Sequence, residues 1–271
     1  MRILILGSRG MLGSICKQYF SNTKHKLETF DKQFSLENYD QYLAEFKSYN
    51  PEIIINCIGK IKQKTDSFSD LMSVNAIFPN LIALHKPEKS VLIQPSTDCV
   101  FSGDLKNEFY KLDDLKDAKD MYGMSKFFGE SVLNNRRDIL ILRGSIIGLT
   151  KGSSSSLMDW FLGHSDGNTV NGYKNHYWNG ITTLQWCKSL ELILEDGSFR
   201  SGGILQFGTE HRHSKYDLLN KINIAFKRSI NINPLSTEED INRCLESNYP
   251  HKIPSIDKQL EEFYTFLNTA H

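Results

Sequence analysis

The sequence predicts an α/β protein, with a doubly wound parallel sheet followed by a smaller C-terminal lobe. Short aliphatic runs alternate with segments that carry apolar residues at helical spacing. The central runs are apolar on both faces, and a glycine-rich turn joins the first run to the first helix. Strands and helices that alternate in this way form βαβ units with parallel strands and right-handed crossovers.

Each element follows from its local pattern. A short aliphatic run between polar or turn residues predicts a buried strand, and apolar residues every three or four positions predict a helix. The expected strands cover residues 2–6, 27–30, 53–58, 91–94, 139–142 and 203–207. The expected helices cover residues 11–20, 42–46, 69–84, 120–134, 182–195, 214–228 and 256–267.

The alternation loosens after about residue 145. Residues 152–156 (Gly-Ser-Ser-Ser-Ser) could form a flexible linker, but apolar residues follow them at helical spacing. We therefore interpret this run as a loop that caps a helix. The chain is expected to divide into residues 1–150, which carry the sheet, and residues 151–271, the smaller lobe. Exchange of a strand between the two lobes is left open.

The composition is that of an ordinary globular protein. The 271 residues are 39% hydrophobic and 24% charged, and 32 basic residues balance 32 acidic ones. This balance gives no electrostatic signal for nucleic acid or an anionic membrane. The N-terminal apolar stretch is short and runs into Gly-Ser-Arg-Gly, unlike a signal peptide. We expect a cytoplasmic protein that neither enters a membrane nor binds nucleic acid.

The cysteines are scattered and form no C-x-x-C pair. They are Cys16, Cys57, Cys99, Cys187 and Cys244. Disulfide frameworks and zinc sites both need closer or paired spacing. We therefore expect free thiols and no metal site.

A glycine-rich turn, G-x-x-G-x-x-G over residues 7–13, lies between the first expected strand and the first helix. Its first glycines bring the backbone close to a pyrophosphate, its third lets the helix pack on the strand, and the helix N-terminus offers free N–H groups. This context predicts a Rossmann-type dinucleotide site, with a structural turn as the alternative. The expected binding residues here are Gly7, Arg9, Gly10, Met11, Leu12 and Gly13.

Charged residues give opposite indications of which dinucleotide binds. Asp31 ends the second strand, where an acid binds the adenosine ribose hydroxyls and repels a 2′-phosphate. Arg9 and Lys32 can instead donate charge-assisted hydrogen bonds to that phosphate. Because an arginine can follow the phosphate while an aspartate can turn into solvent, we expect NADP(H) to be preferred and NAD(H) to be accepted.

Tyr122 and Lys126 form Y-x-x-x-K near the start of the 120–134 helix, so their side chains share one face. An ammonium beside a phenol favours phenolate and lowers the pKa of the phenol. Alone, this pair is common, and a surface pair is the alternative. Thr97, at the end of a predicted strand, strengthens the catalytic interpretation because ligands bind beyond the carboxyl ends of parallel strands.

Together these motifs resemble the extended short-chain dehydrogenase/reductases, most of all the dTDP-4-dehydrorhamnose reductase branch. The resemblance is carried by residues 7–13, 96–103 (STDCVFSG), 122–130 (YGMSKFFGE) and 142–148 (LRGSIIG). Beyond residue 150 it is thinner, at 179–183 and 214–219. It implies an oxidoreductase that uses NAD(P)H to reduce a 4-keto-6-deoxy nucleotide sugar for deoxysugar and surface polysaccharide biosynthesis. Residues 151–271 would be the substrate-binding lobe.

The resemblance also implies residue roles. Tyr122 would protonate the carbonyl oxygen as hydride arrives, Lys126 would bind the nicotinamide ribose, and Thr97 would donate a hydrogen bond to the same oxygen. The resemblance adds Cys57, Ile58, Gly59 and Asn75 to the cofactor-binding residues. The expected substrate residues are Thr97, Asp98, Cys99, Tyr122, Trp178 and Asn179, with Trp178 as a buried core aromatic left open.

Cys99 departs from the branch, whose reductases usually have tyrosine after Ser-Thr-Asp. GDP-fucose synthase has a cysteine there and uses a cysteine and a histidine to epimerise its substrate before reduction. A nucleotide-sugar epimerase or epimerase/reductase is therefore one alternative, and a small buried pocket residue is the simpler role for Cys99. A non-catalytic nucleotide-binding regulator is a further alternative. A homodimer through the 120–134 helix, as in relatives, also stays open.

Overall fold

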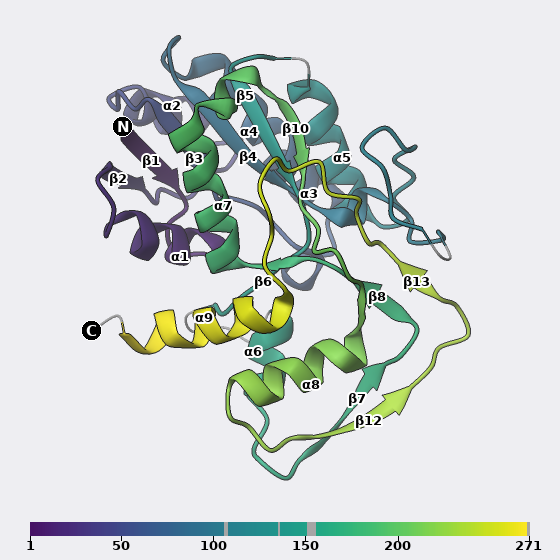
Figure 1. The fold of residues 1–271 in the computed structure, drawn as a ribbon. Helices are drawn as coiled ribbons and strands as arrows, with labels where there is room; N and C mark the ends of the chain where they lie inside the picture. The colour runs from purple at the N-terminus through teal and green to yellow at the C-terminus, as the bar shows by residue number, and fades with distance from the viewer. Residues whose placement is uncertain (106–107, 135, 151–155, 270–271) are drawn as a thin grey trace.

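The computed structural model describes residues 1–105, 108–134, 136–150 and 156–269. Within these ranges, six parallel strands form the central sheet in the order β10-β5-β4-β3-β1-β2 (Figure 1). They are β1 (Arg2–Leu6), β2 (Lys26–Phe30), β3 (Ile53–Asn56), β4 (Val91–Ser96), β5 (Ile139–Arg143) and β10 (Gly203–Gln206). The strand order reverses between β1 and β3, and such a switch point opens a crevice at the carboxyl ends of the strands.

Helices cover both faces of the sheet, which confirms the doubly wound α/β fold. One face packs against α1 (Met11–Phe20) and α7 (Thr183–Asp196). The other face packs against α2 (Tyr39–Phe46), α4 (Phe78–His85) and α5 (Met121–Leu133). Successive strand residues point to opposite faces. The interior strands β1, β3, β4 and β5 are therefore largely apolar, because each face is buried in its own core, whereas the edge strand β2 carries exposed polar residues.

The predicted 69–84 helix is interrupted by a wider turn. It comprises α3 (Phe68–Met72), a π-helical segment (Ser73–Ile77) and α4. Pro79, in the first turn of α4, has no N–H to continue the regular ladder. Such π turns often occur at functional sites, and this one carries the buried side chain of Asn75.

The second lobe is made of short strands and three helices within the described residues. The helices are α6 (Leu157–Leu162), α8 (Lys215–Ala225) and α9 (Ile256–Thr269). The strands are β6 (Ile146–Ile147), β7 (Thr169–Tyr173), β8 (His176–Trp178), β9 (Ile181–Thr182), β11 (His213–Ser214), β12 (Asn231–Leu235) and β13 (Ile241–Asn242). They form small sheets ordered β11-β8-β13, β12-β7 and β6-β9. The sequence pattern did not predict these strands, because few are long enough to show alternation.

The lobes share chain segments. Although β10 and α7 lie beyond residue 150, β10 pairs with β5 and α7 packs against α1. Residues 1–150 alone would therefore lack an edge strand and one covering helix. Short 3₁₀ turns occur at Lys62–Lys64, Asp98–Val100 and Ser198–Ser201.

The predicted loop at residues 152–156 lies mostly outside the described residues. Ser156, at its end, caps α6 through a capping box with Asp159. All five cysteines are free thiols. Among the described residues, no helix is long and apolar enough to cross a membrane, and no group of three or more His, Cys, Asp or Glu side chains could hold a metal ion.

Candidate active site

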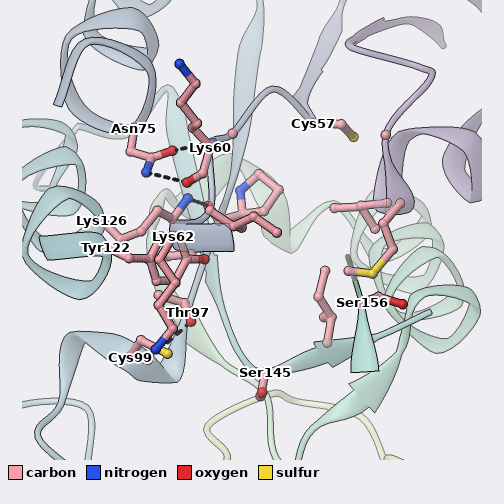
Figure 2. Close-up of a pocket in the computed structure, with 18 of the residues that line it drawn as sticks. Cys57, Lys60, Lys62, Asn75, Thr97, Cys99, Tyr122, Lys126, Ser145 and Ser156 are labelled. Carbon is pink, nitrogen blue, oxygen red and sulfur yellow. Dashed lines mark hydrogen bonds between the residues drawn. The ribbon is translucent and has the colours of Figure 1, made fainter. Parts of the chain in front are cut away.

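A cleft of about 380 Å³ opens at the carboxyl ends of β1, β3 and β4, between the two lobes. Its lining draws on residues from distant parts of the sequence: Gly10–Leu12, Asn56–Lys64, Asn75, Pro95–Cys99, Asp120, Tyr122, Lys126, Gly144–Ile147, Thr150, Ser156 and Leu157. Figure 2 shows Tyr122, Lys126, Thr97 and Cys99 on one side of the cleft, with Cys57 and Ser156 across from them.

The glycine-rich turn has the geometry that a dinucleotide requires. Gly7 has φ +78°, and a Cβ on Gly13 would stand 2.1 Å from the Gly7 carbonyl oxygen, so both positions need glycine. A Cβ on Gly10, in contrast, would make only ordinary contacts, and Gly10 caps α1 without any side-chain hydrogen bond. The N–H groups of the first turn of α1 are thus open to the cleft, as phosphate binding needs.

Asp31 is held more firmly than the sequence suggested. Its carboxylate accepts hydrogen bonds from the Ser8 N–H at 2.6 Å and the Ser8 hydroxyl at 2.8 Å. The prediction that it can turn freely into solvent is therefore wrong. Arg9 is largely exposed and lies 3.6 Å from the same carboxylate. Lys32 pairs with Glu45 at 2.6 Å.

The loop after β3 is fixed by Asn75. The Asn75 side chain accepts from the Lys60 N–H at 2.9 Å and donates to the Lys60 carbonyl at 2.8 Å (Figure 2). It also donates to the Ser125 hydroxyl at 2.9 Å. Asn75 thus connects the loop that carries Cys57, Ile58 and Gly59 to α5. The predicted strand 53–58 ends at Asn56 because the Asn56 side chain accepts from the Ile58 N–H and turns the chain.

The N-terminus of α5 is pressed onto the segment after β4. Asp120 caps the helix by accepting from the Gly123 N–H. A Cβ on Gly123 would stand 2.1 Å from the Cys99 carbonyl oxygen, so only glycine permits this approach. The contact brings Tyr122 beside Thr97, and their side chains share a hydrogen bond.

Tyr122 and Lys126 have opposite shifts in pKa. Burial, with the nearby Cys99 and Asp98, raises the pKa of Tyr122, and the hydrogen bond with Thr97 opposes this only in part. This direction reverses the lowering that the Y-x-x-x-K spacing predicts. Burial lowers the pKa of Lys126 to about 8, and its ammonium donates to the Pro95 carbonyl at 2.7 Å. The phenol therefore holds its proton at neutral pH and can act as an acid.

Thr97, Asp98 and Cys99 form a compact hydrogen-bonded turn at the end of β4. The Thr97 hydroxyl donates to Asp98 at 3.0 Å and accepts from the Cys99 N–H at 3.2 Å. Burial and the Asp98 charge raise the pKa of Cys99 to about 12. Cys99 is therefore a neutral thiol that can give a proton but is a poor base.

Several cleft residues had no predicted role. The Ser96 hydroxyl is buried without a hydrogen-bond partner among the described residues, so a ligand could supply one. The Asn56 side chain donates to Gln94 at 2.8 Å. A polar residue within an otherwise apolar strand is a sign of a functional position that the sequence did contain. Lysines at 60, 62 and 64 also line the cleft, and their alternation directly after a strand is a similar signal.

Trp178 and Asn179 lie in the interior of the second lobe instead of on the cleft wall. Trp178 is 2% exposed and ends β8, so its indole packs into the core. The Asn179 side chain donates to the carbonyls of Thr209 and Leu245 and accepts from the Leu245 N–H. It therefore braces three segments of the lobe.

Known structures share this architecture. A dTDP-4-dehydrorhamnose reductase from Bacillus anthracis in complex with NADP matches with a TM-score of 0.83 and 20% identity, over 97% of this chain and 98% of that one. A dTDP-4-dehydrorhamnose reductase from Clostridium acetobutylicum matches with a TM-score of 0.79 and 18% identity, over 99% of this chain and 100% of that one. A dTDP-glucose 4,6-dehydratase from B. anthracis in complex with NAD matches with a TM-score of 0.75 and 16% identity, over 99% of this chain and 96% of that one.

Sequence comparisons add a family and a curated relative. The spore coat polysaccharide biosynthesis protein SpsK of Bacillus subtilis (strain 168) is 25% identical over 174 residues, which are 62% of this chain and 56% of SpsK. The chain thus aligns with just over half of that relative. The family model of the RmlD substrate binding domain matches residues 1–157, more than half of the chain. The protein therefore belongs to the RmlD substrate binding domain family.

Proposed function

We propose that this protein is an NAD(P)H-dependent oxidoreductase that reduces the 4-keto group of a 6-deoxy nucleotide sugar, in deoxysugar and surface polysaccharide biosynthesis. One observation carries the proposal: Thr97, Tyr122 and Lys126 meet in the same cleft as the open N-terminus of α1. The reductase names of structural neighbours and the polysaccharide role in the name of SpsK support this substrate class.

The residues divide the reaction between them. The cofactor, when bound, supplies hydride to the carbonyl carbon. Tyr122 gives its phenolic proton to the carbonyl oxygen, so the ketone becomes a secondary alcohol, and solvent reprotonates the phenolate. The Thr97 hydroxyl turns its one proton from Asp98 to that oxygen and so donates a second hydrogen bond to it. Lys126 holds a ribose hydroxyl and, as the oxygen of Tyr122 gains negative charge, stabilises it electrostatically.

The cleft fits a phosphate-bearing dinucleotide, and we assign NADP(H) as the preferred cofactor with NAD(H) accepted. The exposed Arg9 side chain can reach a 2′-phosphate while it partly neutralises Asp31. Ser8 fixes Asp31, so repulsion of the phosphate is not relieved by rotation. The preference should therefore be modest. The neighbours in complex with NADP and with NAD are consistent with both cofactors.

The test follows absorbance at 340 nm with a panel of 4-keto-6-deoxy nucleotide sugars and each reduced cofactor. We expect NADPH oxidation that depends on one of these sugars and yields the corresponding alcohol. If folded protein oxidises neither cofactor with any nucleotide or sugar in the panel, the proposed activity is wrong.

Epimerisation is a second candidate because Cys99 lines the cleft beside Thr97. As a neutral thiol, Cys99 can donate a proton to a carbon next to the ketone, but a separate base would have to remove one first. Incorporation of deuterium from D₂O at C3 or C5 of the sugar, without added cofactor, would favour this reaction. Its absence in an active preparation would leave reduction alone.

We also infer a homodimer through α5. Met121, Met124, Phe128 and Val132 are exposed apolar residues at helical spacing on this helix. A contiguous apolar stripe of this kind marks an interaction surface. Light scattering should give twice the 31.1 kDa mass of one chain, and Phe128→Glu should give the monomer. A monomeric wild type would contradict the inference.

A further inference from the structure

The loop after β3 brings three lysines to the cleft wall: Lys60, Lys62 and Lys64. Both ends of this loop are held by Asp70 of α3. The Lys60 ammonium pairs with Asp70 at 2.8 Å, and the Thr65 hydroxyl donates to the same carboxylate at 3.3 Å. Between these two attachments, Lys62 and Lys64 lie in a 3₁₀ turn and are exposed. The loop therefore presents two cations to the cleft from an anchored backbone.

The three lysines differ in how firmly they are paired. Lys60 has a short ion pair with Asp70. Lys62 lies 3.5 Å from Asp120, and its side chain is 62% exposed. The Lys64 side chain makes no hydrogen bond or ion pair with the part of the chain that the structure describes. Because an exposed pair as long as that of Lys62 contributes little stability, Lys62 can exchange Asp120 for an anionic ligand at small cost.

Lys62 lies at the end of the cleft where the carbonyl would react. Asp120 uses one carboxylate oxygen to cap α5, two residues before Tyr122, and turns the other toward Lys62. Figure 2 shows Lys62 on the same side of the cleft as Tyr122 and Thr97, with the purple start of α1 across from them. Lys62 is thus separate from the α1 N-terminus, which is open to the phosphates of the cofactor.

Positive charge gathers in this cleft. Its described lining contains four lysines, at positions 60, 62, 64 and 126, and two aspartates, at 98 and 120. The whole chain, in contrast, has equal numbers of basic and acidic residues. A concave surface with an excess of one charge concentrates ligands of the opposite charge. A nucleotide sugar carries its diphosphate at C1, across the ring from C4, and so brings an anion to this end of the cleft.

We propose that Lys62 and Lys64 bind the diphosphate of the nucleotide sugar. The Lys62 ammonium turns from Asp120 and donates a charge-assisted hydrogen bond to a phosphate oxygen, and Lys64 adds a second positive charge beside it. The diphosphate then holds the sugar with its C4 carbonyl toward Thr97 and Tyr122. This inference rests on the proposed function, because it assumes a nucleotide sugar in the cleft. A contact with the phosphates of the cofactor is the competing arrangement.

The test measures binding by calorimetry for two ligands. One is NADP⁺, and the other is whichever of dTDP, UDP and GDP the wild type binds most tightly. Lys62→Gln should weaken the nucleoside diphosphate about ten-fold, the loss of a charge-assisted hydrogen bond, and should make its binding less dependent on salt. Lys64→Gln should weaken it about three-fold, as an exposed charge is lost. Both variants should bind NADP⁺ like the wild type.

Two further variants serve as controls. Lys62→Arg keeps the charge and should retain most of the affinity for the nucleoside diphosphate. Lys89 is exposed and precedes β4, at the end of the sheet opposite the cleft, so Lys89→Gln should match the wild type with both ligands. In turnover assays, KM for the nucleotide sugar should rise in Lys62→Gln more than kcat falls.

The outcomes distinguish this inference from the proposed function. If Lys62→Gln weakens NADP⁺ and not the nucleoside diphosphate, the lysine serves the cofactor and the inference is overturned. Unchanged affinity and KM in a wild type and a Lys62→Gln variant that both reduce the sugar would overturn the inference alone. If the wild type neither binds a nucleoside diphosphate nor reduces a nucleotide sugar, the proposed function fails with it. Lys62→Ala, measured in the same way, replaces the glutamine variant if that variant does not fold.

Discussion

Different interactions stabilise the interior of each lobe. In the first lobe, parallel strands of four to six residues pair through their backbones, and the interior ones are largely apolar on both faces. In the second lobe, many strands have only two or three residues, and buried asparagine side chains connect them. Asn179 bonds to Thr209 and Leu245. Asn242 accepts from the Cys244 N–H and also donates to the Glu108 carbonyl of the first lobe.

This difference indicates which lobe can change its residues without loss of the fold. The proposed catalytic and cofactor-binding groups lie at the ends of strands and helices of the first lobe, so the backbone fixes their positions. The second lobe presents individual polar side chains on short elements, which can change without loss of a sheet. Recognition of the sugar is therefore expected to depend on single residues of the second lobe, and reduction itself on the first.

Removal of the phenolic hydroxyl should have the largest effect. Tyr122→Phe is expected to lower kcat by about 10²–10⁴-fold, because the general acid is lost, while cofactor affinity stays the same. Stopped-flow turnover and fluorescence titration with NADPH measure the two quantities. Normal turnover in this variant would show that the first lobe does not supply the acid.

The buried ion pair of the first lobe should dominate stability. Arg143 and Glu130 are almost fully buried and bond at 2.7 Å, and Arg143 also donates to Gln206 of β10. Arg143→Met leaves the Glu130 charge unpaired and should lower the free energy of unfolding by about 3–5 kcal/mol. The exposed pair of Arg2 and Glu52 provides the control, since Arg2→Met should cost less than about 1 kcal/mol. Urea unfolding curves measure both, and similar losses would contradict the comparison.

A smaller loss of stability is expected when Asn179, which links three segments of the second lobe, is replaced. Asn179→Ala leaves buried backbone groups of Thr209 and Leu245 without partners and should cost about 1–3 kcal/mol. Asn22→Ala, at an exposed position, should stay within about 0.5 kcal/mol. Equal stability of the two variants would mean that apolar packing, and not Asn179, holds these segments.

Cofactor preference should respond by about one order of magnitude. Arg9→Ala is expected to lower kcat/KM for NADPH about ten-fold, as a charge-assisted hydrogen bond is lost, and to leave NADH nearly unchanged. Asp31→Asn keeps an acceptor for Ser8 but removes the charge, so it should enlarge the preference for NADPH. A wild type that prefers NADH would show that Arg9 does not reach the phosphate.

The smallest effect concerns pH. Burial lowers the pKa of Lys126 to about 8 from its ordinary 10.5, so its charge is lost as pH rises through about 8. Between pH 7 and 8.5, kcat/KM for the cofactor should fall roughly four-fold, since it reports the free enzyme. Over pH 8–10.5 the folded Lys126 binds fewer protons than the unfolded one, so its contribution to stability rises with pH. A fall caused by unfolding would contradict this account.

The fold and the first-lobe residues could be predicted because long apolar runs and fixed motif spacings carry them. All six strands of the central sheet were expected, with ends that differ by at most two residues. The direction of the Tyr122 pKa shift was not expected, because the spacing of residues does not show how deeply a side chain is buried. The fixed position of Asp31 depends on Ser8, and the role of Asn179 depends on hydrogen bonds with Thr209 and Leu245, which lie far away in the sequence.

Transfer of an isotope from the cofactor would show whether this protein reduces the sugar at C4. The protein would be incubated with NADPH that carries deuterium on the transferred position of the nicotinamide, together with the best 4-keto-6-deoxy nucleotide sugar. Nuclear magnetic resonance of the product should show deuterium at C4 of the sugar and a new hydroxyl group there. Product without deuterium at C4, or a sugar changed only at C3 or C5, would contradict reduction at the site formed by Thr97, Tyr122 and Lys126.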